Sequence, residues 1–502
     1  MTPSIQLRAA APALGPIAII MLVALAAISV SILTGGIPTD SATLNLVWTS
    51  QIGDAFAHGE IYPRWLPQSF QGIGSPAFFF YPPIAFFVSG AFNAAGLSPE
   101  QAINAAAFIM LAGSGLAMHA WLRYRGAHPL AGAILYMLAP YHMLDFYGRG
   151  DLAEFSAYLW LPLIALGLEA LPKRWAPPLL GASWAGLMLT HLPMALLVSV
   201  FLIAPLAAIK AWRDRRTIGP GLIAMALGLS LAAIYLVPAL SLQRYVSMDL
   251  LWTERYRPQN WLLADWKNPP PFFLSLPLCA LAASLVALRA RSFWTGLAVA
   301  LSMAAFGLVP IWHIPILEKV QFSWRVLVIV EFAAVTALAT VPPWPLVRAV
   351  AIALAALSYI MVGLLVGTAV QTPKPWYADR IAAMEDAVEY LPAGFGAPVS
   401  RRLPDLSRYR SLPAPTRSIV VERSGPVTLR LGAFPIWRIT RDGRTVASHG
   451  PLLTFDGVPG VYRLERVVTP EETVGAVISL AALLGMIGWM AVWSRRPAAG
   501  HL

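Results

Sequence analysis

Charged side chains are scarce in this sequence. Only 12% of the 502 residues are Asp, Glu, Lys or Arg, whereas a soluble domain carries about 25%. Hydrophobic residues make up 58% of the chain, and they form many apolar stretches of about 20 residues separated by short loops. These stretches are too long and too uniformly apolar to be barrel strands. The sequence therefore excludes an ordinary soluble protein and predicts an all-α polytopic membrane protein.

Cysteine is almost absent as well. The one cysteine, Cys279, excludes an intramolecular disulfide and a cysteine-ligated metal site. The chain also lacks a glycine-rich nucleotide loop that follows a strand, which argues against a soluble ATP or nucleotide-sugar site. We predict no cofactor and no bound metal, although the acidic loops leave a divalent cation open.

Positive charges exceed negative charges by 11. The Lys and Arg residues cluster at alternate helix ends, which is an orientation signal, so we expect no nucleic-acid partner. The apolar segment 78–95 is short and contains Pro82 and Pro83. If this segment only dips into one leaflet, the basic loops all fall on the side of the N-terminus. The positive-inside rule then places both termini in the cytoplasm.

Twelve transmembrane helices follow from this topology. They are expected at residues 13–33, 101–121, 126–143, 155–171, 177–191, 193–211, 218–238, 271–289, 293–310, 324–341, 346–367 and 473–493. The chain divides into a transmembrane domain, 1–370, an extracytoplasmic domain, 371–472, and a final helix with a cytoplasmic tail, 473–502. We expect a multi-pass protein of the bacterial inner membrane, in contact with membrane lipids.

Two regions outside the membrane have their own predicted structure. In the first outer loop, 35–101, the residues at 41–58 have the helical spacing of an amphipathic helix on the membrane surface. In the domain 371–472, a short helix is expected at 376–391. Strands are expected at 418–422, 427–433, 435–440, 444–448 and 461–468, with Asp442-Gly443 as a hairpin turn. A small β-sandwich is the predicted form.

Two groups of acidic residues fall on the predicted outer side of the membrane. The first follows the first helix and consists of Asp40 and Asp54 together with His58. The second follows the third helix and consists of Asp145, Asp151 and Glu154 together with Arg149. A carboxylate in a partly desolvated pocket can act as a general base, and its neighbours can orient an acceptor. The alternative is that these carboxylates are solvated or pair with a neighbour such as Arg149.

Several cations lie near the same side of the membrane. Arg64, Arg149 and Arg325 can each hold a lipid phosphate through two parallel hydrogen bonds, and interfacial anchoring is the alternative for each of them. His191, between two helices, can bind a substrate hydroxyl or be satisfied by the backbone. Glu331, an acid within a predicted span, marks either function or a hydrogen bond to a neighbouring helix.

The order of several motifs resembles the GT-C superfamily of membrane glycosyltransferases. The segments that carry the resemblance are GEIYPRWLPQSFQGIGSPAFFFYPP, LAPYHMLDFYGRGDLAEF, VQFSWRVL and FPIWRITRDG, which are spread over most of the chain. The narrower resemblance is to bacterial membrane proteins labelled "6-pyruvoyl-tetrahydropterin synthase-related". It implies a GT-C-like fold with juxtamembrane helices in the first outer loop, at 41–58 and 78–95.

The resemblance also implies a reaction and roles for residues. The donor is a sugar linked to polyprenyl phosphate, and the acceptor is a cell-envelope glycan, a lipid or a protein. Asp40 corresponds to the catalytic base of an inverting transfer, and Asp151 or Glu154 to the second acid. Arg325 or Arg64 would stabilise the leaving phosphate. The family often has two adjacent acids or Asp-x-Asp in the first loop, whereas Ser41 follows Asp40 here, which argues against a tightly bound metal.

Two other classes of protein stay open at this point. A flippase or exporter of lipid-linked sugars requires a polar path through the helices, for which Glu331 is the clear intramembrane acid. A non-catalytic membrane scaffold would use its β domain to bind glycan. In either case the carboxylate of Asp40 would not be needed for sugar transfer.

Overall fold

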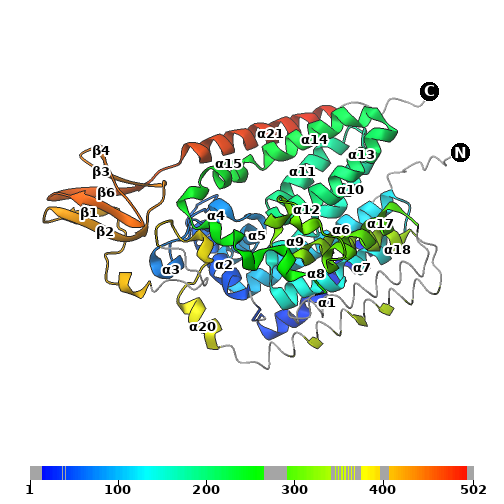
Figure 1. The fold of residues 1–502 in the computed structure, drawn as a ribbon, viewed down its shortest axis with the longest axis horizontal. Helices are drawn as coiled ribbons and strands as arrows, with labels where there is room; N and C mark the ends of the chain where they lie inside the picture. Colours follow the sequence, from blue (N-terminus) through cyan, green and yellow to red (C-terminus); the bar gives the residue numbers. More distant parts are fainter. Residues whose placement is uncertain are drawn as a thin grey trace.

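The computed structural model describes residues 14–264 except 37 and 40, residues 291–340, scattered positions between 345 and 367, and residues 375–395 and 406–494. The chain is mostly helical, with a small strand-rich domain near its C-terminal end, which confirms the predicted division into a helical part and a β part. Figure 1 shows the strands at one end of the helical bundle.

Five helical segments among the described residues are long and apolar enough to cross a membrane. They are α1 (Leu14–Thr34), α6 (Pro99–Tyr124), α9 with α10 (Leu152–Ala157 and Trp160–Ala170), α12 with α13 (Leu192–Val198 and Ala204–Arg213), and most of α21 (Pro470–Ser494). A sixth span arises if α14 (Ile218–Leu231) and α15 (Ala233–Ser241), which meet at 64°, count as one. The chain is therefore a membrane protein, and the predicted count of twelve spans is not confirmed.

The remaining predicted spans are shorter helices or lie outside the described residues. The shorter helices are α7 (Pro129–Met137), α11 (Ala176–Met188), α17 (Phe293–Phe306) and α18 (Leu327–Ala339). All 13 residues of α18 are buried, so this helix is enclosed by its neighbours. The predicted span 271–289 and most of 346–367 fall outside the described residues.

The break between α14 and α15 is stabilised by other parts of the chain. The backbone N–H of Ile234 donates to Ser479 Oγ of α21 at 2.8 Å, and this hydroxyl donates to the carbonyl oxygens of Ser230 and Leu231. Gly475 allows the close approach of α21, because a Cβ there would lie 2.5 Å from the carbonyl oxygen of Ala233. The polar groups exposed by the bend are thus satisfied within the protein, as the membrane interior requires.

The first loop contains the predicted helix at 41–58, which is α2 (Ala42–Ala57), followed by α3 (Ser69–Gly72), α4 (Ala77–Phe80) and α5 (Ile84–Ala94). The first half of α2 is enclosed by other parts of the chain, because its polar residues Thr43 and Asn45 are buried. Thr49 is buried, and its hydroxyl lies 2.8 Å from that of Ser89 on α5. The 11 residues of α5 extend about 16 Å, roughly half of the hydrocarbon thickness, so length alone does not make 78–95 a span.

The strand-rich domain contains two antiparallel sheets. The four-stranded sheet has the order β1 (Ser418–Val421), β6 (Gly460–Arg466), β3 (Trp437–Arg441) and β4 (Arg444–Val446), and β2 (Gly425–Gly432) pairs with β5 (Leu452–Gly457). The predicted Asp442-Gly443 hairpin is confirmed, because both residues have positive φ and Arg441 pairs with Arg444. Phe455 and Tyr462 pack between the sheets with ring centroids 4.9 Å apart.

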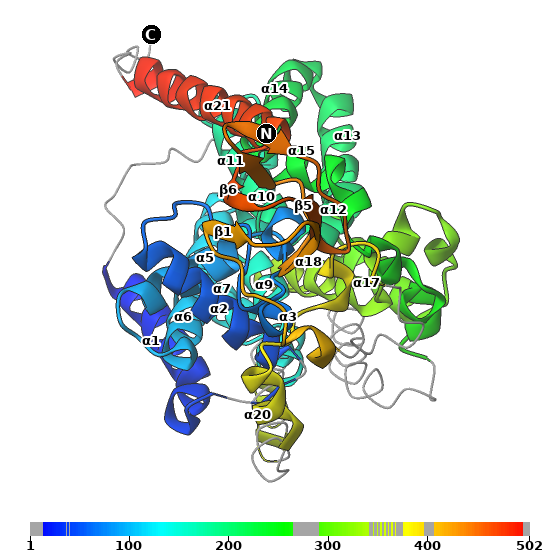
Figure 2. The ribbon, with the colours of Figure 1, turned by 90° about the vertical axis from the view of Figure 1, so that its left-hand side faces the viewer.

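The strand-rich domain is joined to the helices by the first loop and by the segment after α20 (Pro375–Ala382). Helix α20 is shorter than the predicted helix at 376–391. Asp386, just beyond it, is buried and accepts a hydrogen bond from Trp48 Nε1 of α2 at 2.8 Å. Burial raises the pKa of this carboxyl to about 6. Figure 2 shows the strands in front of the helices when the molecule is viewed from the sheet end.

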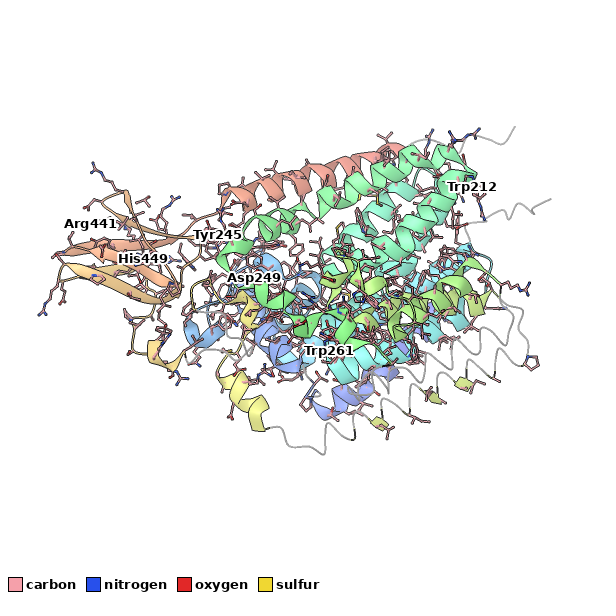
Figure 3. The ribbon with its side chains drawn as sticks, viewed as in Figure 1. Trp212, Tyr245, Asp249, Trp261, Arg441 and His449 are labelled. Atoms are coloured by element: carbon pink, nitrogen blue, oxygen red, sulfur yellow. The ribbon has the colours of Figure 1, made fainter. Side chains whose placement is uncertain are left out.

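Aromatic residues mark both ends of the bundle. Tyr245 lies where the sheets meet the helices, with its ring 5.9 Å from that of Phe434, and Trp212 lies at the far end of α13, where it is 86% exposed (Figure 3). Lys210 and Arg213 lie in the last turn of the same helix. Such aromatic and basic ends are typical of helices that emerge from a membrane.

Candidate functional site

A cavity of about 340 Å³ lies at the junction of the first loop, the segment after α8 and the segment that precedes α18. The polar and aromatic side chains that line it include Ser41, Trp48, Tyr81, Arg149, Asp151, His191, Gln243, Lys319, Gln321, Arg325, Glu389 and Tyr390. Leu192, Leu236 and Leu240 give it an apolar wall. One cavity thus gathers four of the predicted site residues, which come from distant parts of the chain.

The local sequence explains how Asp151 is positioned. Helix α8 (Pro140–Leu144) continues as a π-helix, Asp145–Arg149, which ends at Gly150 with φ +67°. A Cβ at Gly150 would lie 1.9 Å from Thr39 Oγ1, so only glycine fits here. Asp151 then caps α9, because its Oδ1 accepts a hydrogen bond from the backbone N–H of Glu154 at 3.0 Å.

The same segment is tied to the start of α2. The backbone N–H of Ser41 donates to the carbonyl oxygen of Arg149 at 3.1 Å, and Asn45 Nδ2 donates to that of Gly150 at 2.7 Å. These bonds hold the start of α2 beside the segment that carries Arg149 and Asp151. Asp40, the predicted base, lies outside the described residues.

Glu154 is the centre of a buried ionic network. Its side chain is fully buried, and its Oε2 accepts hydrogen bonds from Arg149 Nη1 at 2.9 Å and from Arg325 Nε at 3.0 Å. Its Oε1 accepts a hydrogen bond from Tyr141 Oη at 2.6 Å. Two guanidinium groups from sequence-distant segments therefore share one carboxylate, which fixes both of them at the wall of the cavity.

Arg149 contacts two further acids. Its Nη1 bonds Asp145 Oδ1, and its Nη2 donates to Asp151 Oδ2 at 3.2 Å. Burial raises the pKa of Asp145 well above its usual range, and the charge of Glu154 raises it further. Asp145 Oδ2 has no hydrogen-bond partner among the described residues.

A strained turn positions Arg325. Gln321 has φ +69° and ψ −51°, and the backbone N–H of Phe322 donates to the carbonyl oxygen of Val320 at 2.9 Å. This is a γ-turn of the rare, strained form. It presents the Val320 carbonyl and the Gln321 side chain as acceptors for Arg325 Nη1, at 2.7 and 3.0 Å. The turn therefore holds the Arg325 guanidinium in one orientation at the cavity.

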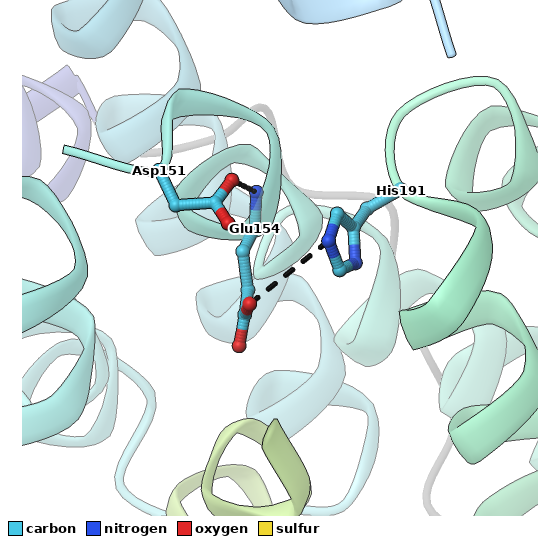
Figure 4. Close-up of side chains that lie close together, drawn as sticks. All are labelled: Asp151, Glu154 and His191. Atoms are coloured by element: carbon cyan, nitrogen blue, oxygen red, sulfur yellow. Dashed lines mark hydrogen bonds and ion pairs between the residues drawn. The ribbon is translucent and has the colours of Figure 1, made fainter. Parts of the chain in front are cut away.

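Asp151, Glu154 and His191 offer three possible metal ligands within 4.8 Å of one another (Figure 4). Two observations argue against a cation there. The carboxylate oxygens already accept hydrogen bonds from Arg149 and Arg325. His191 Nδ1 accepts a hydrogen bond from the backbone N–H of Met194 at 3.2 Å, so the proton of the neutral ring sits on Nε2, the nitrogen 3.9 Å from Glu154. The geometry suits an ionic network better than a metal centre.

The other predicted site residues lie away from this cavity. Asp54 and His58 form an exposed pair at 3.4 Å near the end of α2, and neither lines the cavity. Arg64 is buried at a second cavity, where its Nη2 donates to the carbonyl oxygen of Ile234 at 2.7 Å. The structure thus brings together Arg149, Asp151, Glu154, His191 and Arg325, and separates Arg64, Asp54 and His58 from them.

Glu331 is accounted for by structural hydrogen bonds. Its carboxylate accepts bonds from the backbone N–H groups of Tyr141 and His142, at 2.6 and 3.2 Å, and from Tyr158 Oη at 2.6 Å. The acid therefore caps the first turn of α8. Its role here is to position the segment that carries Arg149.

Sequence reasoning missed several residues that line the cavity. Tyr81 lies in the motif FFFYPP, and Gln321 lies four residues before Arg325. Glu389 and Tyr390 belong to the segment after α20, and no local pattern connects them with the acidic loops. Positions 320–325 could have been found from the motif VQFSWR, whereas Glu389 required the tertiary structure.

Comparison of the chain with protein-family models, with curated proteins and with solved structures finds no match.

Proposed function

We propose that this chain is an inverting glycosyltransferase that moves a sugar from a polyprenyl-phosphate-linked donor to an extracytoplasmic acceptor. The observation that carries the proposal is the cavity that combines a carboxylate, Asp151, with two fixed guanidinium groups, Arg149 and Arg325. In the proposed orientation, the chain lies in a bacterial inner membrane with this cavity and the strand-rich domain on the periplasmic side. Both termini are then cytoplasmic.

The proposed reaction needs a base and a site for a leaving phosphate. The base removes the proton of an acceptor hydroxyl, and that oxygen forms a bond to the anomeric carbon of the sugar. The bond between this carbon and the phosphate oxygen breaks, and the polyprenyl phosphate leaves with the electron pair. General-base assistance contributes about 10²–10⁴-fold, so stabilisation of the phosphate by fixed cations must supply much of the remaining rate enhancement.

The proposal assigns these roles to named residues. The resemblance to GT-C enzymes gives Asp40 the role of base, and its neighbour Ser41 lines the cavity. Arg149 and Arg325 are the proposed phosphate-binding cations. Their mutual contact with Glu154 fixes them before the donor binds, which reduces the reorganisation that the reaction requires. Glu154 is thus a positioning residue, and the apolar wall at Leu192, Leu236 and Leu240 suits the prenyl chain.

An exporter of lipid-linked sugars is less well supported. It requires polar groups along a path through the helices, and Glu331 was the residue that favoured it. Both oxygens of Glu331 are occupied by hydrogen bonds to Tyr141, His142 and Tyr158. This acid is therefore engaged in packing α8 against α18.

The test is a transfer assay with membranes that contain the wild-type protein or a single variant. A panel of polyprenyl-phosphate sugars serves as donors, and transfer to endogenous acceptors is measured. We expect Asp40→Asn to lower transfer by about 10²-fold or more while the protein still inserts in the membrane. Asp456→Asn, on an exposed position of β5, is the matched control and retains wild-type transfer.

Three outcomes contradict the proposal or part of it. Wild-type membranes without transfer from any donor would contradict the reaction class. Unchanged transfer by Asp40→Asn would contradict the role of Asp40. An equal loss in Asp456→Asn would show that the assay reports expression or insertion, and the loss in Asp40→Asn would then carry no support for a catalytic base.

A further inference from the structure

A second cavity of about 550 Å³ lies where α21 leaves the strand-rich domain. Its wall combines the first loop, α15, the end of β6 and the first turns of α21. The residues that determine its chemistry are Glu60, Tyr62, Arg64, Arg466 and Glu472. None of them lines the cavity of the proposed active site.

Glu472 is fixed in place by the helix that begins beside it. Its backbone N–H donates to Thr469 Oγ1 at 3.3 Å, and its Oε2 accepts a hydrogen bond from the backbone N–H of Thr469 at 2.9 Å. This is a capping box, with Thr469 as the N-cap of α21. The buried Glu472 carboxylate is therefore a fixed charge of the fold.

Two guanidinium groups share this single carboxylate. Arg466 Nη2 donates to Glu472 Oε1 at 3.0 Å, and Arg64 Nε lies 3.4 Å from the same oxygen. Arg64 is only 3% exposed, and its Nη1 has no hydrogen-bond partner among the described residues. The Arg64 guanidinium lies over the Tyr62 ring, 4.0 Å from the ring centroid. This part of the wall thus has an excess of positive charge, which an anion would balance.

The rim of the cavity supplies the opposite charge and an apolar edge. Glu60 is exposed, and it forms no ion pair among the described residues. Val468 and Val477 are 64% and 61% exposed. Val477 lies within α21, a candidate membrane span that begins at Pro470, whereas Val468 precedes that span. Val477 therefore faces the apolar phase beyond the charged groups. This places the charged wall at the depth of lipid headgroups.

We propose that this cavity binds the headgroup of phosphatidylethanolamine, with the phosphate toward Arg466 and Arg64 and the ammonium toward Glu60. The two arginines and the two acids sum to zero charge, so they match a zwitterion better than an anionic lipid. A primary ammonium also has three donors for a carboxylate, whereas a trimethylammonium group has none. The proposal is independent of the proposed glycosyltransferase function.

Such a lipid would act on the joint between the strand-rich domain and the membrane helices. Arg64 also donates to the carbonyl oxygen of Ile234, beside the bend between α14 and α15. A phosphate that neutralises Arg64 and Arg466 would therefore stabilise the contact of the first loop with both α15 and α21.

The experiment measures which lipids remain bound to the detergent-solubilised full-length protein by native mass spectrometry. The protein is equilibrated with equal amounts of phosphatidylethanolamine, phosphatidylcholine and phosphatidylglycerol that carry the same acyl chains. Wild-type protein should retain phosphatidylethanolamine above the other two. Arg466→Gln should lower its occupancy about tenfold, as expected for the loss of one charge-assisted hydrogen bond.

Two further variants separate the parts of the proposal. Glu60→Gln should lower the occupancy of phosphatidylethanolamine to that of phosphatidylcholine, because only the ammonium contact is lost. Arg463→Gln, at an exposed position of the same strand β6, is the matched control and should bind like wild type. Arg466→Lys, which keeps the charge, should bind better than Arg466→Gln. The ratio between lipids within one variant does not depend on that variant's overall stability.

Several results would overturn the proposal. Equal or better retention of phosphatidylglycerol would show that the site takes an anionic lipid. Displacement of the lipid by millimolar inorganic phosphate would show that it takes free phosphate. Unchanged retention in Arg466→Gln, or an equal loss in Arg463→Gln, would remove the cavity as the site of binding.

Discussion

Substitution of Glu154 by Gln tests whether the buried ionic network holds the candidate site together. The side chain keeps its shape but loses its charge, and an N–H₂ group takes the place of one acceptor oxygen. Arg149 and Arg325, which donate to Glu154 Oε2 at 2.9 and 3.0 Å, lose their shared counter-charge. Removal of one partner from a buried ion pair costs about 3–5 kcal/mol. We expect a loss of unfolding free energy in this range.

A double-mutant cycle isolates the contact between Glu154 and Arg325. Arg325→Gln alone removes one cation, and Arg149 still balances part of the Glu154 charge. Once Glu154 is neutral, loss of Arg325 costs less, because an unpaired buried cation is removed. The double variant should therefore be more stable than the sum of the two single effects predicts, by about 1–3 kcal/mol.

The assay is reversible unfolding in mixed micelles, followed by far-UV circular dichroism during titration with SDS. The control cycle uses Asp54→Asn and His58→Gln, because their side chains lie 3.4 Å apart and are 57% and 77% exposed. An exposed pair contributes at most about 1 kcal/mol, so its cycle should give little coupling. Equal coupling in the two cycles, or no coupling between Glu154 and Arg325, would refute the network as an organising element of the site.

Three further predictions concern stability. The pKa of Asp386 is raised from 3.8 to about 6. The folded state therefore binds this proton more tightly than the unfolded state, and the protein loses stability as the pH rises from about 4 to 6. Asp386→Asn should abolish this pH dependence in thermal unfolding, and a dependence that persists in the variant would assign it to other groups. Gly475→Ala should lower the free energy of unfolding by about 1–3 kcal/mol, because its Cβ would meet the Ala233 carbonyl oxygen at 2.5 Å. Gly485→Ala, whose Cβ meets nothing within 4 Å, is the control, and an equal loss there would contradict close packing as the cause. Gln321→Gly and Gln321→Ala both remove the side-chain acceptor for Arg325, but only glycine adopts the positive φ of this position without strain. The glycine variant should therefore be more stable than the alanine variant by about 1 kcal/mol in the same unfolding assay. Equal stability of the two variants would mean that the turn stores no strain.

Local sequence patterns predicted the elements whose geometry depends on a few neighbouring residues. The Asp442-Gly443 turn and the helix at Ala42–Ala57 are both observed. Strand β5, Leu452–Gly457, was not predicted. Its sequence LLTFDG begins with two apolar residues in succession, so the alternation that marks a half-buried strand is weak. The predicted twelve spans relied on apolar length, and that signal does not separate a spanning helix from a short, enclosed helix such as α18.

Part of the candidate site was also within reach of the sequence. Arg149, Asp151 and Glu154 are separated by at most five residues, so their proximity follows from chain connectivity. Arg325 lies 171 residues beyond Glu154, and no local pattern connects the two. The counter-charge of Arg325 comes from another segment, because its Nε donates to Glu154 Oε2 at 3.0 Å. Only the tertiary structure shows that the motifs LAPYHMLDFYGRGDLAEF and VQFSWRVL meet at the carboxylate of Glu154.

Arg64 illustrates why residue type alone does not identify the group that an arginine binds. A guanidinium group donates hydrogen bonds to a phosphate, a carboxylate or a peptide carbonyl with similar geometry. The sequence indicated an arginine close to the membrane, and a leaving phosphate was one acceptor that suited it. The structure places its Nη2 on the Ile234 carbonyl, whose partner four residues on is Pro238 and has no backbone N–H, and its Nε near Glu472. A carbonyl left open by a proline within a helix and the carboxylate of a capping box thus compete with a substrate for arginines at this depth. Before an arginine is assigned to a phosphate, the backbone carbonyls and carboxylates near it must therefore be checked as its hydrogen-bond acceptors.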